Sequence, residues 1–222
     1  MRKKTKTSDQ WAQIFATLRD WASRTPHPSL NVLHDSGSTP WQILVATIIS
    51  LRTRDAVTLE VSQRLFLKAP GAKELLGLPP DQLEALLYPS AFYRRKAVQL
   101  RSLAGLLSPP EYAVPKTANE LLKLPGVGHK TANLVLNLAF GIDAICVDTH
   151  VHRIANRMGW IKTATPDESE AALEKILPQR YWIETNSLLV AFGQSQCTPV
   201  SPRCSTCPFC EDCPKMGVKT HR

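Results

Sequence analysis

Lys130 is the residue whose type and surroundings most directly suggest covalent chemistry. It follows a glycine-rich turn in the stretch 124–133, which reads Leu-Pro-Gly-Val-Gly-His-Lys-Thr-Ala-Asn. An amine attacks carbon only when it is deprotonated, and an ordinary lysine is mostly protonated at neutral pH. A helix N-terminus and partial burial both disfavour the ammonium form. We therefore interpret Lys130 as a candidate nucleophile, and the alternative is a solvated lysine beside a phosphate-binding turn.

Asp148 is the matching candidate for acid–base chemistry. It lies in the segment 147–153, which reads Val-Asp-Thr-His-Val-His-Arg. A carboxylate can stabilise a developing positive charge and transfer protons. The same residue stands where a helix N-cap is expected, and a capping carboxylate is fixed in orientation, so the two roles are compatible. We expect His150 and His152 to be structural partners rather than ligands or bases.

Five of the six cysteines gather near the C-terminal end of the chain. Four have the spacing Cys-x6-Cys-x2-Cys-x5-Cys, and the fifth, Cys210, falls inside the last gap. Prolines throughout this stretch predict a loop. Four thiolates around a compact centre can bind tetrahedral zinc or an iron–sulfur cluster. Zinc sites usually combine two close pairs, so the single close pair here fits zinc less well. Disulfides are the remaining alternative, and Cys146 is predicted to be a core residue.

The turn before Lys130 is predicted to join two helices. Thr117 is a suitable N-cap with Glu120 at the capping-box position, and Pro125 should end the first helix. Gly126 and Gly128 allow positive φ and a close approach of the backbone.

The second helix is expected from about His129 to Phe140, with Gly141 as its left-handed C-terminal residue. The N–H groups at the start of such a helix attract phosphate. The predicted phosphate contacts are therefore Gly126, Gly128, His129 and Thr131.

Hydrophobic periodicity, with proline and glycine punctuation, predicts helices along the rest of the chain. They are expected at 9–23, 40–51, 56–67, around 75–76, 83–87, 92–107, 149–158, from 165 onward, and at 181–192. Pro109-Pro110 should end the helix at 92–107. Only 142–147 hints at a strand, and it has no partner nearby. The predicted fold class is therefore all-α.

Composition indicates a globular protein with an anionic partner. The net charge is +8 and 43% of the residues are hydrophobic. A basic protein suits a polyanion such as nucleic acid, although charge alone is weak evidence. No secretory signal is visible, and the longest apolar run, 43–51, is too short to span a membrane. We expect a soluble, cytoplasmic chain, in which disulfides are disfavoured.

Taken together, the stretch 124–133, the Asp148 segment and the cysteine spacing resemble the endonuclease III family of helix-hairpin-helix DNA glycosylases. The three motifs occur in the family's order, and the resemblance covers about Trp41 to Cys213. It implies a six-helix barrel domain with the helix-hairpin-helix at 33–142. It implies a second helical domain, made of 1–32 and 143–222, that carries a C-terminal iron–sulfur loop. It also implies that Lys130 and Asp148 face each other across an interdomain cleft. The implied [4Fe–4S] ligands are Cys197, Cys204, Cys207 and Cys213.

The function implied by the resemblance is a bifunctional DNA glycosylase with AP lyase activity. Such an enzyme removes oxidised pyrimidines from double-stranded DNA and cuts 3′ to the abasic site by β-elimination. We expect a monomer that associates with the bacterial nucleoid and not with membranes.

The resemblance also implies residues that fill the gap left by an extruded nucleotide. Arg52 stands where the family commonly has glutamine, and Phe92 stands where it has an aliphatic residue. An ordinary surface charge is the alternative for Arg52, and a core position is the alternative for Phe92. Arg203 is the one basic residue in the loop where relatives carry several that contact DNA.

Three alternative functions are weighed against this one. An adenine-type monofunctional glycosylase of the same superfamily needs a carboxylate on the helix at 41–51, and residues 41–54 contain no Asp or Glu. A non-catalytic DNA-binding module would use the hairpin and the cysteine loop for architecture alone. A zinc-bound regulatory protein would lack the visible absorption of an iron–sulfur centre.

Overall fold

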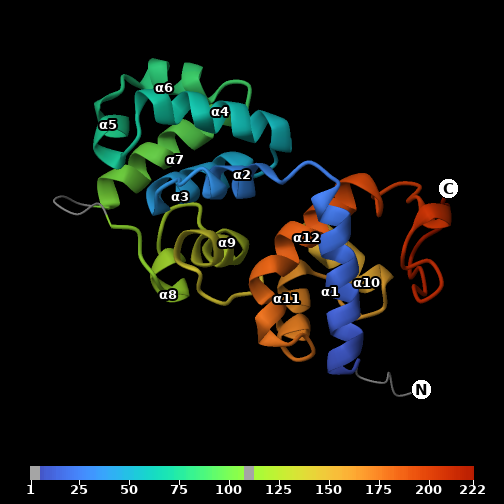
Figure 1. The fold of residues 1–222 in the computed structure, drawn as a ribbon. Coiled ribbons are helices and arrows are strands. Elements are labelled where there is room, and N and C mark those ends of the chain that lie inside the picture. Colours follow the sequence, from blue (N-terminus) through green and yellow to red (C-terminus); the bar gives the residue numbers. More distant parts are fainter. Residues whose placement is uncertain (1–5, 108–112) are drawn as a thin grey trace. The chain divides into compact units, whose positions relative to one another are not determined.

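Helices are the only regular elements in residues 6–107 and 113–222, which are the residues that the computed structural model describes (Figure 1). The all-α prediction is thus confirmed. The chain divides into two compact units. We call Pro28–Ile142 the hairpin unit, and residues up to His27 together with Asp143–Arg222 the cysteine unit. Within the described ranges, no helix combines the length and apolar character needed to cross a bilayer.

The hairpin unit is built around one apolar helix. Its described residues form α2 (Ser29–Asp35), α3 (Pro40–Ser50), α4 (Asp55–Lys68), α5 (Ala72–Gly77), α6 (Pro80–Leu87), α7 (Tyr93–Leu106), α8 (Ala118–Leu121) and α9 (His129–Phe140). Helix α3 packs against α2, α4, α7 and α9. It begins with a capping box between Thr39 and Gln42, followed by Pro40. Because α3 is buried on nearly all sides, its sequence is apolar on all sides, as predicted for 40–51.

The N-terminal helix belongs to the cysteine unit. That unit comprises α1 (Ser8–Ser23), α10 (Thr149–Arg157), α11 (Pro166–Glu174), η1 (Gln179–Tyr181), α12 (Trp182–Ser195) and η2 (Cys204–Thr206). Helix α12 packs against both α1 and α10. Phe15 of α1 stacks on Tyr181 with ring centroids 4.1 Å apart, and Trp11 meets Trp160 edge-on at 5.1 Å. These aromatic pairs attach α1 to the far end of the sequence.

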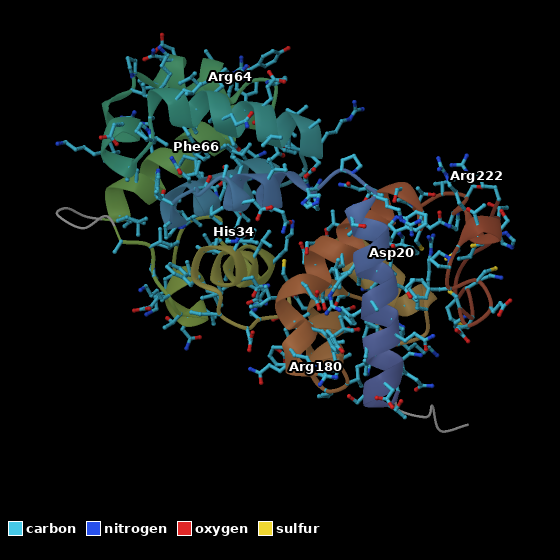
Figure 2. All side chains as sticks on the ribbon, in the orientation of Figure 1. Asp20, His34, Arg64, Phe66, Arg180 and Arg222 are labelled. Carbon is cyan, nitrogen blue, oxygen red and sulfur yellow. The ribbon has the colours of Figure 1, made fainter. Side chains whose placement is uncertain are left out.

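Two basic residues labelled in Figure 2 make contacts between distant segments of the cysteine unit. Arg180 donates a hydrogen bond to Ser8 Oγ at 2.8 Å and lies over the Tyr181 ring at 4.8 Å. Arg222 uses its backbone: its N–H donates to the Pro202 oxygen at 3.0 Å, and its oxygen accepts from Ser205 N–H at 3.1 Å. The last residue is therefore paired with the loop that carries the cysteines.

The structure departs from the sequence predictions at a few positions. Helix α2 was not predicted, because a seven-residue segment shows little periodicity. The first helix of the hairpin ends at Leu121, whereas it was expected to reach Pro125. Residues 142–147 form no strand. Residues 28–32 belong to the hairpin unit, and the described part of that unit has eight helical segments where the resemblance implied six. The stop predicted at Pro109-Pro110 lies outside the described residues.

Candidate active site and cysteine loop

The turn between α8 and α9 is shaped by one glycine in a left-handed conformation. Thr117 caps α8, and its hydroxyl also donates to the Glu120 carboxylate at 2.6 Å. Gly126 has φ +73°, where a side chain would be strained. Gln99 Nε2 donates to the Pro125 oxygen at 3.1 Å and lies where a Cβ on Gly126 would go. The conformation of the turn and the position of Gln99 therefore require glycine at position 126.

Gly128 has a different role from the one predicted. It is the N-cap of α9 with φ −97° and ψ 179°, an extended conformation open to any residue, so the positive φ that glycine allows is used at Gly126 and not here. Apart from its two chain neighbours, no heavy atom of the described residues lies within 4 Å of where its Cβ would be. Because glycine has no capping side chain, the N-cap residue makes no side-chain hydrogen bond to the first-turn N–H groups of α9. The open space leaves room for an anion to approach them.

Lys130 is the second residue of α9, as predicted, and it is half-buried. No acidic residue lies in the first turn of this helix. His129 is exposed, whereas the Thr131 side chain is buried. Thr131 could therefore meet a phosphate only through its backbone.

Asp148 is the N-cap of α10, which confirms one of its two predicted roles. Its Oδ1 accepts hydrogen bonds from the N–H groups of His150 and Val151, both at 2.8 Å. Oδ2 takes no part in this cap. The carboxylate is half-buried and fixed in orientation. The prediction that His150 and His152 are structural partners is also confirmed, because His150 Nδ1 lies 3.1 Å from Arg153 Nη2 and His152 Nδ1 lies 2.7 Å from Ser169 Oγ.

Two arginines of α10 hold the start of the cysteine loop. Arg153 donates to the Cys197 carbonyl oxygen from Nε at 3.2 Å and Nη2 at 2.9 Å. Burial lowers the pKa of Arg153. Arg157 donates to the Thr198 and Pro199 oxygens, each at 2.7 Å, and to Cys197 Sγ at 3.5 Å. Helix α10 thus carries Asp148 at one end and the loop anchors along its length.

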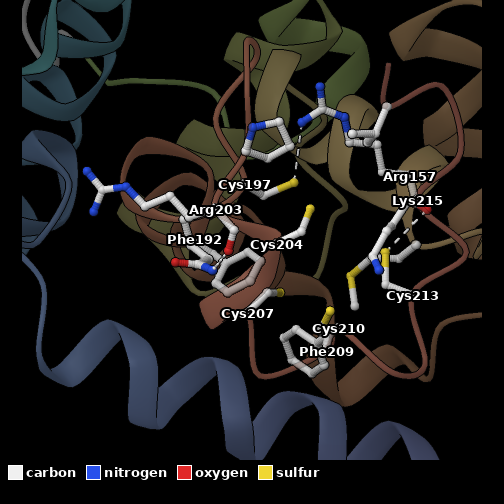
Figure 3. Close-up of a pocket in the computed structure, with 14 residues that line it drawn as sticks. Arg157, Phe192, Cys197, Arg203, Cys204, Cys207, Phe209, Cys210, Cys213 and Lys215 are labelled. Atoms are coloured by element: carbon white, nitrogen blue, oxygen red, sulfur yellow. Dashed lines mark hydrogen bonds between the residues drawn. The ribbon is translucent and has the colours of Figure 1, made fainter. Parts of the chain in front are cut away.

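The five C-terminal cysteines line one cavity with Arg157, Phe192 and Lys215 (Figure 3). Burial is the largest cause that raises the pKa of the Cys204, Cys207 and Cys213 thiols. Lys215 and Arg157 act in the opposite direction on Cys204. In residues 6–107 and 113–222, no group of three His, Cys, Asp or Glu side chains could hold a metal ion as it stands.

The two predicted gap-filling residues have the same unusual backbone conformation. Arg52 follows α3 and Phe92 precedes α7, and each has φ 56°. Arg52 is exposed, and Phe92 is 62% exposed, so the alternative of a core position for Phe92 is wrong. Arg203 is exposed at the edge of the cysteine loop.

Lys96 is a site residue that the sequence analysis missed. It is only 4% exposed and lies on the buried face of α7 with Leu100 and Leu103. A lysine at that spacing from two core leucines is the signal that could have identified it, because lysine is rarely buried without partners.

Comparison with known proteins agrees with this architecture. The model of a family described as "HhH-GPD superfamily base excision DNA repair protein" matches residues 45–179. Endonuclease III of Thermotoga maritima is 45% identical over 170 residues, which cover 76% of this chain and 79% of that protein.

Two solved structures are also similar. The chain in "Structure of a non-covalent Endonuclease III-DNA Complex" aligns with TM-score 0.80 and 34% identity over 92% of this chain and 95% of that one. The chain in "Structure of a Trapped Endonuclease III-DNA Covalent Intermediate: Estranged-Adenine Complex" aligns with TM-score 0.77 and 32% identity over 92% and 96%.

The hairpin, the helical units and the family match define a class, the helix-hairpin-helix DNA glycosylases of base excision repair. Within that class, the chain belongs to the endonuclease III family.

Proposed function

We propose that Lys130 and Asp148 carry the reaction of this base excision repair DNA glycosylase and AP lyase, and that its substrates are oxidised pyrimidines in duplex DNA. The observation that carries the proposal is the place of Lys130, half-buried in the first turn of α9 beside uncapped N–H groups. Those N–H groups favour a phosphate at the same helix end. A nucleophile and a phosphate-binding turn are thereby combined in one short segment.

The proposed reaction begins with attack of Lys130 Nζ on C1′ of the damaged nucleotide. The glycosidic bond breaks and its electron pair leaves with the base. The sugar ring then opens to give a Schiff base between Nζ and C1′. Loss of a C2′ proton and of the 3′ phosphate cuts the strand by β-elimination, and hydrolysis of the Schiff base releases Lys130.

Asp148 would supply the charge and the proton transfers that these steps require. Its carboxylate can stabilise the cationic sugar and the Schiff base, and accept the proton that Nζ loses on attack. The N-cap bonds both end on Oδ1, so this role falls to Oδ2. The target base must leave the helical stack to be reached, which makes extrusion part of the reaction.

Duplex DNA is the proposed partner. A net charge of +8 suits a polyanion, and two similar solved structures contain DNA by their descriptions. The proposed phosphate contacts are the backbone of Gly126 and Gly128, the exposed His129 and the Thr131 N–H group. Arg203 would contact the backbone from the cysteine loop. Arg52 and Phe92 would fill the gap left by the extruded nucleotide.

The cysteine loop would hold a [4Fe–4S] cluster. The donor set fits, because a shared cavity lined by thiols and flanked by Arg157 and Lys215 suits an anionic cluster held by thiolates. When bound, the cluster would cross-link the loop. The proposed ligands are Cys197, Cys204, Cys207 and Cys213, and Cys210 stays outside the set.

Borohydride trapping on a duplex with an oxidised pyrimidine tests the proposal. Borohydride reduces the Schiff base and leaves Lys130 covalently attached to DNA. Lys130→Gln should lose the adduct and keep duplex affinity. Lys123→Gln is the matched control, since it removes an exposed lysine from the same hairpin and should trap like the wild type. Trapping by Lys130→Gln at the wild-type rate would show that another amine is the nucleophile, and absence of trapping by the wild type would favour a non-catalytic DNA-binding module.

A further inference from the structure

The buried ammonium of Lys96 lies at the junction of two loops. Its Nζ donates to the Ile49 oxygen at 2.6 Å, the Leu51 oxygen at 2.9 Å and Thr53 Oγ1 at 2.8 Å. The three N–H groups of the ammonium therefore have three acceptors, all at the end of α3 or in the loop after it. That loop, residues 51–54, presents Arg52.

Thr53 connects this loop to a second one. Its Oγ1 accepts from the N–H group of Ala91 at 3.2 Å as well as from Lys96. Ala91 directly precedes Phe92, whose oxygen accepts the first-turn bond of α7 from the backbone N–H group of Lys96 at 3.0 Å. The loop before α4 is thus joined to the loop before α7 by the Thr53 hydroxyl and to α7 itself by the Lys96 ammonium, although Thr53 and Ala91 are 38 residues apart in sequence.

Both loops hold a residue that needs such support. Arg52 and Phe92 have φ 56°, a left-handed conformation that side chains other than glycine, Asn and Asp rarely adopt. Strain of this kind persists only where surrounding contacts fix the backbone, and it gathers at functional positions. The turn at Arg52 is closed by the bond from the Thr53 N–H group to the Ser50 oxygen at 3.0 Å, and it is tied to the Phe92 loop by Thr53 Oγ1 and to α7 by the Lys96 ammonium.

We propose that Lys96 and Thr53 are positioning residues that couple the Arg52 loop to the Phe92 loop, so that both residues enter the DNA as one preformed unit. This inference rests on the proposed function, because it assigns the coupled loops to nucleotide extrusion. Neither residue touches the reacting atoms in this scheme. Preformed loops would spare the enzyme the cost of ordering them while it also breaks base stacking.

The test uses the full protein with four substitutions. Thr53→Val removes the shared hydroxyl at constant shape, and Thr53→Ser keeps it. Lys96→Met removes the ammonium and keeps most of the side chain's apolar stem. Lys73→Met makes the same exchange at an exposed lysine of α5 and is the control. Should Lys96→Met fail to fold, the two Thr53 variants still decide the question.

The first measurement is amide hydrogen exchange at 50–54 and 90–92. Exchange should rise in both loops for Thr53→Val and Lys96→Met, and return toward wild type for Thr53→Ser. A rise confined to residues 50–54 would overturn the coupling, and so would no rise at all. This measurement needs no DNA, so it decides the coupling even if the wild type proves to have no glycosylase activity.

The second measurement separates extrusion from the later chemistry. Single-turnover base excision from duplex should slow on the order of tenfold to a hundredfold in Thr53→Val, whereas cleavage of a preformed abasic site should change much less. Equal losses on both substrates, or no loss of excision, would overturn the positioning role. The proposed function fails separately, by absence of excision and trapping in the wild type.

Discussion

Arg153 donates two hydrogen bonds to the carbonyl oxygen of Cys197, from Nε at 3.2 Å and from Nη2 at 2.9 Å. These bonds are possible because the residue of α12 that lies against His150 and Arg153 is Gly193, which has no side chain. A Cβ on Gly193 would lie 2.4 Å from His150 Nδ1 and 2.9 Å from Arg153 Nη2. The bonds that join α10 to the cysteine loop therefore depend on glycine at position 193, because a side chain there would occupy the space of His150 and Arg153.

Gly193→Ala should accordingly destabilise the protein, by about 1–3 kcal/mol if overpacking displaces the two side chains. Gly105→Ala is the matched control, because Gly105 also lies in a helix and, apart from its chain neighbours and its own helix backbone, no heavy atom of the described residues lies within 4 Å of its Cβ position. There the exchange should be neutral or stabilising by up to about 1 kcal/mol. Denaturant unfolding of both variants measures the difference, and equal free energies of unfolding would contradict the close approach.

Substitution of Asp148 should separate its two roles. Asp148→Asn keeps an Oδ1 that can cap α10 but removes the charge, so stability should hold while excision slows by roughly 10²–10⁴-fold. Asp148→Ala removes both and should also lower the free energy of unfolding by about 1 kcal/mol. Single-turnover excision and denaturant unfolding are measured on the same samples. An Asn variant that excises at the wild-type rate would leave Asp148 as a cap alone.

Four of the five C-terminal cysteines should bind the iron–sulfur cluster, and Cys210 should not. Protein purified without air is expected to be yellow-brown, with broad visible absorption and with iron and sulfide bound. Cys204→Ser should lose colour and iron, whereas Cys210→Ser should keep both. The two cysteines line the same cavity, so the pair controls for general disturbance of the loop. Stoichiometric zinc in colourless wild-type protein would refute the iron–sulfur assignment.

Arg52 should make excision depend on the base opposite the lesion. Its guanidinium is always charged and presents a planar fork of donors that matches the acceptors of guanine. We expect guanine to be favoured as the opposite base. Arg52→Ala should slow excision from duplex more than from single strands, which have no orphaned base. Arg203→Ala, another exposed arginine, should weaken binding without changing the opposite-base preference; unchanged excision rates in Arg52→Ala would identify Arg52 as an ordinary surface charge.

Lys96 should give the stability of the protein a pH dependence at alkaline pH. Burial lowers the pKa of Lys96 from its usual 10.5 to about 8, and the groups that face its ammonium are two carbonyl oxygens and one hydroxyl. Between these two pH values the unfolded chain holds a proton that the folded chain has lost. The free energy of unfolding therefore rises with pH in this window, by at most about 1.4 kcal/mol per pH unit.

The difference in unfolding free energy between wild type and Lys96→Met isolates this effect. It should increase from about pH 8 to 10.5, in favour of the wild type. Below pH 8 the difference should be constant. A difference that stays flat across the whole range would show that Lys96 titrates alike in folded and unfolded protein.

Local sequence signals predicted much of the fold. Thr117 and Thr165 cap the helices expected after them, and α9 has the predicted bounds, ending at Gly141 with φ 63°. These features depend on neighbours in sequence, so a short window of residues contains them. Helix α2 escaped prediction because its formation depends on burial of Leu30 and Leu33 rather than on local preference.

The contacts between distant segments could not be predicted in the same way. The motif around Asp148 includes Arg153. It does not show that the Arg153 guanidinium donates to the Cys197 oxygen, forty-four residues away in sequence. The contact of Lys96 with Thr53 likewise joins segments forty-three residues apart. Sequence periodicity shows which face of a helix is buried, but it does not show which distant loop lies against that face.

The packing of α1 against α12, Trp160 and Tyr181 also sets an order of events during translation. The ribosome releases Trp11 and Phe15 before the hairpin unit, whereas their partners Trp160 and Tyr181 emerge only after that whole unit has been made. The hairpin unit is one continuous stretch and can fold as soon as it is released. Helix α1 must meanwhile keep its apolar face unpaired, and chaperones bind such faces. Vectorial synthesis therefore makes the cysteine unit the last part of the nascent chain to fold.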